Sequence, residues 1–360
     1  MSGAYSDTKA AWHLDKILAM RQGLQVVPAQ VQLIISDLCN QDCHFCAYRM
    51  SGGFSSEQFG EGGNKNPNRK IPTLKAMEIL DDCQILGVKA IQFTGGGEPT
   101  VHPDHLSLFR YAQDLGLETS LVTNGVRFME GWEQILPKMK WVRVSIDAGK
   151  AEEYAAVRRV KPEFYEKALG NVKALASQIE TQGTDCLLGV GYVITMENWQ
   201  DLYDGIVRIR DTGAAYVRLS AMFSNEGATY YGEALPAIRE QIKRVKDLET
   251  DRFKVVDLFG DRIADLVQHA PDYEFCGYQQ FNMYVGGNLR VYRCCTTAYT
   301  KHGEVGDLTN QRLVKWFYSD QKKAAYADFN ARSCHTCQFN GKNRMIAELT
   351  GEPPLHVNFV

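Results

Sequence analysis

Short apolar runs alternate with helical patterns up to about residue 250, and this alternation limits the fold more strongly than any other feature of the sequence. The apolar runs are rich in β-branched residues, as buried parallel strands are. They cover residues 31–36, 90–95, 118–124, 141–147, 186–195 and 216–222. Helical patterns cover residues 73–87, 103–116, 130–139, 162–180, 198–212 and 233–250. This order predicts an α/β fold, a partial (β/α)6 barrel of the TIM type with its active site at the C-terminal ends of the strands.

The alternation ends near residue 250, and the sequence beyond it predicts a second, smaller α+β domain. Residues 254–259 fit one more strand and residues 261–269 a helix. The segment FNMYVGGNLRVYRCC (281–295) predicts a β-hairpin around a Gly-Gly-Asn turn, and residues 309–330 return to a helical pattern. We therefore expect three parts, which are a helical extension over residues 1–28, a barrel over 29–250 and an auxiliary domain over 251–360.

Composition and charge exclude several classes of protein. Hydrophobic residues make up 44% and charged residues 23% of the 360 residues, as in ordinary globular proteins. The 40 basic and 43 acidic residues nearly cancel, so the balance does not indicate a nucleic-acid partner. No run approaches the ~20 apolar residues of a membrane span, and the N-terminus lacks the apolar core of a signal peptide. We expect a cytoplasmic protein without a membrane partner.

Ten cysteines are the unusual feature of this composition. In a chain without an export signal, clustered cysteines more often bind metal or act chemically than form disulfides. Cys39, Cys43 and Cys46 form a C-x3-C-x2-C loop directly after the first apolar run. Three thiolates on one loop can hold three irons of a 4Fe-4S cluster and leave the fourth iron open to a ligand. Zinc is the alternative, because a structural zinc site normally has four protein ligands and His44 could be the fourth.

The residues around this loop resemble those of the radical S-adenosylmethionine (radical SAM) superfamily. The resemblance rests on CNQDCHFCAYRM (39–50) at the end of the first strand and TGGGEP (94–99) at the end of the second, and it extends over about residues 30–250. It implies that the open iron binds the amino and carboxylate groups of SAM. An electron from the cluster would then cleave SAM, and the 5′-deoxyadenosyl radical would abstract a hydrogen atom from the substrate. It also implies a reductant of the flavodoxin or ferredoxin type.

By the same resemblance, the TGGGEP loop is expected to contact SAM. Gly95, Gly96 and Gly97 would let a ligand approach the backbone closely, although a tight turn between strand and helix also needs such residues. Glu98 follows at the strand end, where its carboxylate would pair with the SAM ammonium group.

Aromatic and polar residues on other strand ends complete the expected SAM site. Phe45 or Tyr48 would lie against the adenine, with simple packing as the alternative. Ser145 and Asp147 end the fourth strand in VSIDA and are similar to the family's S-x-D segment, which contacts the ribose and the carboxylate.

Further candidates are less certain in register or role. Arg158 is similar in position to the family's arginine that pairs with the SAM carboxylate, but Arg159 is an equally basic neighbour. Thr123 and Asn124 end the third strand and face the same cavity, although Asn-Gly is also an ordinary turn. Asn198 is a weaker candidate, because it could instead cap a helix.

A second set of cysteines lies in the C-terminal region. Cys276, Cys334 and Cys337, together with one of the adjacent pair Cys294 and Cys295, could close around a 4Fe-4S cluster without an open iron, with zinc again as the alternative. The hairpin ending in VYRCC, the GEVGDL segment, a helix containing Trp316 and the final C-x2-C resemble the SPASM/twitch extension of radical SAM enzymes. Five cysteines fit the shorter twitch form with one auxiliary cluster, and the spacing is similar to that of the 2-deoxy-scyllo-inosamine dehydrogenase of aminoglycoside biosynthesis.

We expect Cys294 to be the ligand and Cys295 to be either buried filler or a functional thiol, since adjacent residues on a strand point in opposite directions. Cys83 and Cys186 fit simple core positions.

The expected reaction follows from a single auxiliary cluster that could accept an electron from a substrate radical. The first reading is dehydrogenation or epimerisation of a small molecule of the polyol or aminosugar type. The second is modification of a peptide or protein side chain, which is disfavoured because the first ~30 residues are too few for a leader-binding domain. A zinc-binding module without enzymatic activity is the remote alternative. The Gly-, Ser- and Asn-rich loop 51–70 and the tail 338–360 are expected to shape the substrate pocket.

Overall fold

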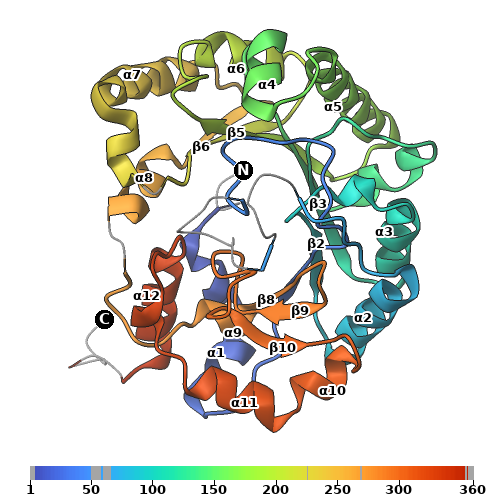
Figure 1. Cartoon of the computed structure of the whole chain (residues 1–360), viewed down its shortest axis with the longest axis vertical. Helices are drawn as coiled ribbons and strands as arrows, with labels where there is room; N and C mark the ends of the chain where they lie inside the picture. The colour runs from blue at the N-terminus through green and yellow to red at the C-terminus, as the bar shows by residue number, and fades with distance from the viewer. Residues whose placement is uncertain are drawn as a thin grey trace.

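The computed structural model describes residues 5–49, 58–59, 66–224, 226–267, 270–352 and 355, and its strands form one sheet (Figure 1). The first part of this sheet is parallel and lies in chain order. It consists of β1 (Gln30–Leu33), β2 (Ala90–Phe93), β3 (Glu118–Thr123), β4 (Trp141–Ser145), β5 (Leu187–Ile194), β6 (Tyr216–Ala221) and β7 (Lys254–Asp257). Because β7 is an edge of the described sheet, these strands form an open, partial barrel. The predicted α/β fold class is confirmed.

Helices cover the outer face of the barrel and form the ring visible in Figure 1. They are α2 (Thr73–Leu86), α3 (His105–Asp114), α4 (Ala151–Arg158), α5 (Glu163–Gln182), α6 (Leu202–Arg210), α7 (Leu235–Lys246) and α8 (Phe259–Val267). The residues of β4 show why the faces differ. Val142 and Val144 are fully buried in the core shared with the helices, whereas Arg143 and Ser145 lie on the opposite face, which lines the barrel interior.

Some predicted elements need correction. The prediction of a helix over residues 130–139 is wrong, because the segment contains two short 3-10 turns, Trp132–Gln134 and Leu136–Lys138. Gly131 has a positive φ of 88° and Pro137 lies at the start of the second turn, and both residues interrupt an α-helix. The extra strand expected at 254–259 is present as β7, and it pairs with β6, so the barrel sheet continues past residue 250.

The C-terminal hairpin extends the barrel sheet beyond β1. β8 (Asn282–Val285) pairs in parallel with β1, and β9 (Arg290–Tyr292) and β10 (Glu304–Asp307) follow antiparallel. The hairpin is therefore confirmed, but its pairing with β1 was not expected. Around it lie α9 (Tyr278–Phe281), α10 (Leu313–Phe317), α11 (Asp320–Ala327) and α12 (Asn340–Thr350). Trp316 is fully buried in the same core as the barrel, and its indole donates to the Val305 carbonyl at 3.2 Å.

The N-terminal segment covers the end of the barrel where the strands begin. A 3-10 helix (Asp7–Trp12) and α1 (Leu14–Arg21) both contact α12. Ile17 of α1 shares a small apolar cluster with Phe281 and Ile346. Tyr5 reaches the first residue of β6, where its hydroxyl donates to Tyr216 Oη at 3.1 Å. The expected helical extension thus covers the N-terminal ends of the barrel strands.

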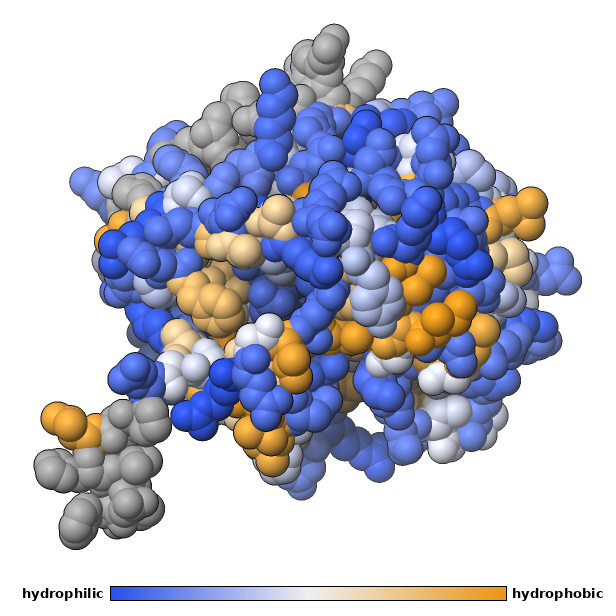
Figure 2. Space-filling model, turned by 90° about the horizontal axis from the view of Figure 1, so that it is seen from below, coloured by the Kyte–Doolittle hydropathy of each residue, from blue (hydrophilic) through white to orange (hydrophobic). Residues whose placement is uncertain are grey.

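The outer surface is mostly hydrophilic on the face seen in Figure 2, with several separate apolar patches. None of the described helices has the length and apolar character needed to cross a bilayer.

Candidate cofactor and active site

The three cysteines of the C-x3-C-x2-C motif lie together on the loop that follows β1. Cys39, Cys43 and Cys46 are half-buried and carry free thiols. Burial, followed by the charge of Glu98, raises the pKa of Cys39 to about 12, and burial together with Cys43 raises that of Cys46 to about 12. Such thiols stay protonated at neutral pH unless a metal displaces the proton, so the loop suits a metal centre.

The cysteine loop is fastened to the end of α4. Asp42 N donates to the Arg158 carbonyl at 3.0 Å, and His44 N donates to the Val157 carbonyl at 3.1 Å. The side chain of His44, considered above as a fourth zinc ligand, has its Nε2 3.6 Å from Glu197 Oε2. Among the described residues, no three His, Cys, Asp or Glu side chains are as close together as a single metal ion requires. A mononuclear zinc site would therefore require these side chains to move.

The TGGGEP loop after β2 packs directly against the cysteine loop. A Cβ at Gly97 would collide with the backbone of Leu38, and a Cβ at Gly96 would collide with the rings of Phe59 and Tyr299. Contacts within the protein thus require glycine at both positions, whether or not a ligand also approaches them.

Glu98 joins the ends of β2 and β3 through a buried hydrogen-bond network. Its Oε1 accepts from Thr100 N at 3.0 Å, from Thr100 Oγ1 at 2.8 Å and from Thr123 Oγ1 at 2.6 Å, and its Oε2 accepts from Asn124 N at 2.7 Å. Asn124 Nδ2 in turn donates to Asn40 Oδ1 of the cysteine loop at 2.7 Å. Burial raises the pKa of Glu98 despite these bonds. Oε1 accepts three hydrogen bonds and Oε2 accepts one. The expected bond to an ammonium group would therefore use the free lone pair of Oε2.

Arg158 is buried against the cysteine loop, whereas its neighbour Arg159 meets the loop at the surface, with its Nη1 3.5 Å from Asp42 Oδ2. Arg158 is 3% exposed, forms a buried ion pair with Asp147 and donates from Nη1 to Gln41 Oε1 at 2.5 Å. Its guanidinium lies 6.0 Å from the ring centroid of Phe45, and its Nε is buried without a hydrogen-bond partner. Although burial opposes the charge, Asp147 raises the pKa of Arg158 further above its ordinary value. Arg159 is half exposed in the left-handed conformation that ends α4.

The segments after β4 and β5 are locked to one another. Asp147 Oδ1 accepts from Val193 N at 2.7 Å, so both carboxylate oxygens of Asp147 have protein partners. The fully buried Asn198 donates to the carbonyls of Asp147 and Val193 at 2.9 and 2.8 Å. It closes the loop after β5 and does not cap α6, which begins at Leu202. Ser145 is half-buried at the end of β4.

Tyr48 packs among protein rings, as the alternative to adenine stacking requires. Its ring lies 5.7 Å from that of Phe59 and 6.0 Å from that of Tyr299, and Tyr284 Oη donates to its hydroxyl at 3.3 Å. Phe45 lies elsewhere, beside His44 and Arg158. Among the described contacts, Phe45 has no aromatic partner from the C-terminal hairpin, whereas Tyr48 has. Phe45 is therefore the better placed of the two candidates for an adenine contact.

A buried aspartate links the cysteine loop to the C-terminal hairpin, and no sequence motif had singled it out. Asp37, two residues before the first cysteine, is fully buried. Its Oδ1 accepts from the Tyr299 hydroxyl, and its Oδ2 accepts from Arg69 Nε at 2.9 Å. Gly287 N donates to the same Tyr299 hydroxyl at 3.1 Å. The hairpin is thereby held against the start of the cysteine loop.

The loop predicted to act as a lid, residues 51–70, lies largely outside the described residues, since only 58–59 and 66–70 are described. The described part is bound to the hairpin region. Gln58 N donates to the Tyr299 carbonyl at 2.8 Å, and Tyr292 Oη donates to Gln58 Oε1 at 2.8 Å. In the tail, residues 353–354 and 356–360 are likewise outside the described residues.

Four of the five C-terminal cysteines line one cavity. They are Cys276, Cys294, Cys334 and Cys337, and the rings of Tyr273, Tyr278, Phe329 and Phe339 also line it. Burial raises the pKa of Cys334 to about 12. Three donors point at the sulfur of Cys337, namely Tyr273 Oη at 3.3 Å, Phe339 N at 3.3 Å and Asn343 Nδ2 at 3.8 Å. This is the donor set that a cluster thiolate uses.

Cys295 does not line this cavity. Its Sγ accepts from Gln338 Nε2 at 3.2 Å, and it packs with Tyr48 against the aromatic cluster that contains Tyr284 and Tyr299. Burial, followed by Cys294, raises its pKa to about 12. Cys295 therefore lies between the two groups of cysteines.

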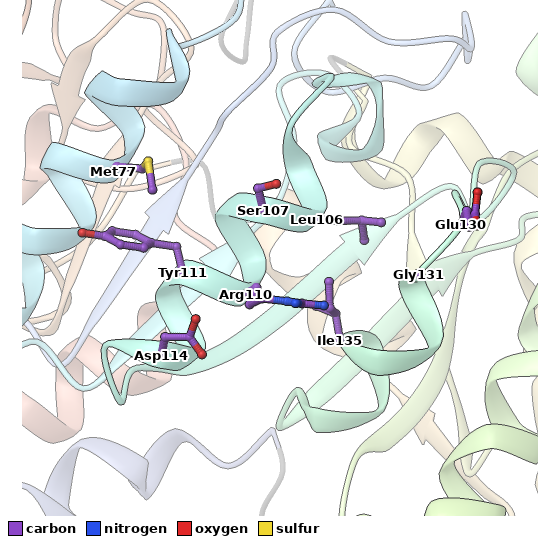
Figure 3. A pocket seen from close by; sticks show the side chains of 9 residues that line it. All are labelled: Met77, Leu106, Ser107, Arg110, Tyr111, Asp114, Glu130, Gly131 and Ile135. Carbon is purple, nitrogen blue, oxygen red and sulfur yellow. The ribbon is translucent and has the colours of Figure 1, made fainter.

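A separate surface pocket of about 370 Å³ lies on the helix side of the barrel (Figure 3). Its lining comes from α2, α3 and the segment before the second 3-10 turn, and consists of Met77, Leu106, Ser107, Arg110, Tyr111, Asp114, Glu130, Gly131 and Ile135. It contains none of the cysteines or expected SAM contacts.

Comparison with known proteins agrees with this geometry. Residues 33–205 match the model of the radical SAM superfamily. The AdoMet-dependent heme synthase of Methanosarcina barkeri is 23% identical over 209 residues, which is 57% of this chain and 53% of that protein. The PqqA peptide cyclase of Ruegeria pomeroyi is 23% identical over 301 residues, 79% of this chain and 77% of that protein. This chain spans about half the length of several curated relatives that it matches.

A solved structure shares the fold over almost the whole chain. SuiB of Streptococcus suis bound to S-adenosylmethionine superposes with a TM-score of 0.63 and 16% identity, covering 98% of this chain and 78% of that protein. The cysteine loop after β1 and the matching sequence model lead to one conclusion: residues 33–205 of this chain are a radical SAM domain.

Proposed function

We propose that this chain holds a 4Fe-4S cluster on Cys39, Cys43 and Cys46 and uses it with SAM to remove a hydrogen atom from a substrate in the barrel. The observation that carries the proposal is the gathering of these three thiols at the C-terminal edge of the sheet, against the Glu98 network. When bound, the cluster and SAM supply a 5′-deoxyadenosyl radical as the hydrogen acceptor. The protein then has to bind SAM, position the substrate and exclude water.

Arg158 is the proposed partner of the SAM carboxylate. Its Nη1 and Nη2 each donate one hydrogen, to Gln41 and Asp147, so the unpartnered Nε and the second hydrogens of Nη1 and Nη2 are the donors considered for a ligand. Phe45 lies beside it as the proposed adenine contact. The remaining proposed contacts are Gly96, Gly97, Glu98, Thr123, Asn124, Ser145 and Asp147. In this proposal Thr123, Asn124 and Asp147 act mainly by fixing the loops, because their side chains already bind other protein groups.

The cavity of the second cysteine group is the proposed site of an auxiliary cluster. Cys276, Cys294, Cys334 and Cys337 would fill all its ligand positions. Such a cluster would supply an electron acceptor, which suits net oxidation of the substrate.

The finer proposal is dehydrogenation or epimerisation of a small hydroxylated molecule. In dehydrogenation the substrate loses a hydrogen atom to the 5′-deoxyadenosyl radical, then one proton and one electron, and a carbonyl forms. In epimerisation the Cys295 thiol would return a hydrogen atom from the opposite face, and one electron from the reduced auxiliary cluster and one proton would restore the thiol. The position of Cys295 between the two cysteine groups supports this role.

Peptide modification is the second candidate, and the relative that favours it is the PqqA peptide cyclase. One experiment distinguishes the two candidates. The chain is incubated with SAM, a reductant and either a polyol library or a peptide library, and 5′-deoxyadenosine is measured. The class in which 5′-deoxyadenosine formation rises above the uncoupled rate is the substrate class.

The test of the proposed function uses the whole chain after anaerobic reconstitution. We expect a brown protein with about eight irons from two clusters. We also expect 5′-deoxyadenosine from SAM when dithionite is added. A colourless protein with two zinc ions and no SAM cleavage would contradict the proposal and support a zinc-binding module.

Replacing both Cys334 and Cys337 by Ala should remove about four of eight irons, because each cluster holds about four. Iron and sulfide analysis measures the loss, and electron paramagnetic resonance of the reduced protein should retain the signal of one cluster. The matched control is Cys186→Ala, which removes a buried thiol outside both groups. Full iron content in the double variant would overturn the assignment of the auxiliary site.

Tyr273→Phe should lower the reduction potential of the auxiliary cluster without removing it. The single proton of the Tyr273 hydroxyl is shared between Cys337 Sγ at 3.3 Å and Asn340 Oδ1 at 2.9 Å, and the bond to the sulfur stabilises the more negative, reduced state. Loss of a bond worth about 1 kcal/mol shifts a one-electron potential by roughly 40 mV. The control is Tyr278→Phe, which removes a hydroxyl from the same cavity wall. Redox titration followed by electron paramagnetic resonance decides, and equal potentials in both variants would refute the role of Tyr273.

A further inference from the structure

The interior of the barrel holds two rows of side chains below the cysteine loop. Strand register places Ser145, Gly191 and Arg218 in the upper row and Arg143, Gly189 and Tyr216 in the lower row. A Cβ at Gly191 would lie 3.5 Å from Arg143 Cδ, and a Cβ at Gly189 would collide with the Tyr216 ring. The two glycines of β5 thus leave the space into which Arg143 and Tyr216 lean.

Within the part of the chain that the structure describes, the positive charges in these rows have no carboxylate partner. Neither Arg143 nor Arg218 forms an ion pair with a carboxylate of the described residues. The charged neighbours that act most strongly on Arg218 are the cations Arg143 and Arg262 and the phenols Tyr5 and Tyr216. Arg143 Nη1 donates to Tyr5 Oη at 3.4 Å, and the Arg218 guanidinium lies 5.8 Å from the Tyr5 ring centroid.

Arg218 is a cation held in an unfavourable environment. Its Nε is buried without a hydrogen-bond partner. Burial, followed by the charge of Arg143, lowers its pKa to about 9, so it stays protonated at neutral pH. The Arg218 side chain is half-buried, and a charge partly removed from water without a counter-ion is costly, so a bound anion lowers that cost.

Other polar groups in the same interior are also unsatisfied. Both side-chain polar atoms of Asn282 and the Oε1 of Gln32 are buried without partners. Asn282 and Tyr5 line a cavity of about 280 Å³ at the lower end of the barrel. The lower end of the barrel, where Tyr5 meets the arginine rows, is therefore polar and incompletely filled by protein atoms.

A further arginine, Arg262, lies toward the auxiliary cysteines and forms an ion pair with Asp265, with 3.7 Å between Nη1 and Oδ2. The Arg262 guanidinium lies 4.1 Å from the centroid of the Phe223 ring, and its Nη2 donates to Gln338 Oε1 at 2.8 Å. Gln338 in turn donates to Cys295 Sγ. Arg262 and Gln338 thus connect the surroundings of Arg218 to the candidate thiol.

We propose that the substrate carries an anionic group, a carboxylate or a phosphate, which binds Arg218 inside the barrel with Arg143 adding positive charge. This inference rests on the proposed function and narrows it. The SAM carboxylate is assigned to Arg158, so Arg218 is left for the substrate. An aminosugar with a free ammonium group is disfavoured, because it would enter a space already positive.

The test measures binding of simple anions to the reconstituted whole chain with SAM bound, by isothermal titration calorimetry. Inorganic phosphate and acetate are the probes, and glycerol is the neutral comparison. We expect one of the anions to bind and glycerol not to bind, and Arg218→Met to weaken the anion at least tenfold. Arg218→Lys, which keeps the charge, should retain the affinity within about threefold, and Arg143→Met should weaken it by a smaller factor than Arg218→Met. Arg208→Met, on the outer face of α6 beside Glu166, is the matched control and should bind as the unmodified chain does.

Phosphate binding alone would identify a phosphorylated substrate, and acetate binding a carboxylate substrate. The inference is overturned if neither anion binds the unmodified chain, or if both Arg218 variants and the Arg208 variant bind the anion equally. Cleavage of SAM by the unmodified chain is measured separately. Absence of that cleavage refutes the proposed function, whereas cleavage without Arg218-dependent anion binding refutes only the anionic substrate.

Discussion

Cys43→Ala is expected to abolish the reductive cleavage of SAM. Even residues that only support a metal ligand typically cost 10–100-fold when they are changed, so loss of a ligand itself should cost more than about 100-fold. Cys43 is the middle cysteine of the loop, and the flanking backbone of Asp42 and His44 is bound to the end of α4. The rest of the chain therefore keeps the loop in place when the thiol is lost. Production of 5′-deoxyadenosine in the presence of dithionite measures the effect, together with iron content.

The matched control is Cys83→Ala, the same substitution in the middle of α2. Cys83 is fully buried in the main core, away from both cysteine groups, and burial raises its pKa far above the ordinary value. Its loss leaves a small cavity that costs about 1 kcal/mol of stability and leaves iron content unchanged. If Cys43→Ala cleaved SAM at the rate of Cys83→Ala, the first cluster would have been assigned to the wrong residues.

The barrel could be predicted from the sequence because its strands are buried on the helix side and end in polar residues. β6 shows this well: Val217 and Leu219 are fully buried in the core, and the predicted run 216–222 matches Tyr216–Ala221 within one residue. A parallel sheet then fixes which ends of the strands meet, so the cysteine loop and the TGGGEP loop had to be neighbours. The contact between Glu98 N and the Leu38 carbonyl, at 2.9 Å, is the result.

Long-range pairings could not be predicted in this way. Nothing in the local pattern of residues 282–285 indicates that they pair with β1, because a strand records its own burial and not the identity of its partner. For the same reason the sequence did not predict the hydrogen bond from the Tyr299 hydroxyl to Asp37, which joins residues 262 positions apart. Tyr299 has a positive φ of 61°, a conformation that sequence patterns do not predict for an aromatic residue.

The sequence also could not decide which of two adjacent residues occupies a site, and the structure does. Sequence spacing left Arg158 and Arg159 equivalent, and the end of α4 separates them, since Arg159 adopts the left-handed conformation that turns its side chain to solvent. In the same way Cys294 lines the cavity of the second cysteine group while Cys295 lies toward Tyr48. The two cysteines follow β9, which ends at Tyr292, and Cys295 lies in the turn after it, so this turn and not the alternation of a strand separates them.

Arg158→Met is expected to destabilise the chain more than any other single change of a surface or site residue considered above. The substitution keeps the length of the side chain and removes its charge, which leaves the Asp147 carboxylate 1% exposed without its ion-pair partner. Removing one partner of a buried pair costs about 3–5 kcal/mol, because the remaining charge is uncompensated. Urea unfolding of the iron-free chain measures the free energy, so that loss of the cluster does not contribute.

Arg159, the next residue in the chain, provides a matched control. Arg159→Met makes the same chemical change one position later, on a half-exposed side chain that lies 3.5 Å from a partly exposed Asp42, and should change the free energy of unfolding by less than about 0.5 kcal/mol. The double variant Arg158→Met, Asp147→Asn tests the cause. The amide introduced by Asp147→Asn can still accept from Val193 N without carrying a buried charge, so much of the lost stability should return. Equal destabilisation by the two arginine variants, or no recovery in the double variant, would mean that the Arg158 side chain acts by packing against Phe45 and Tyr154 and not by its charge.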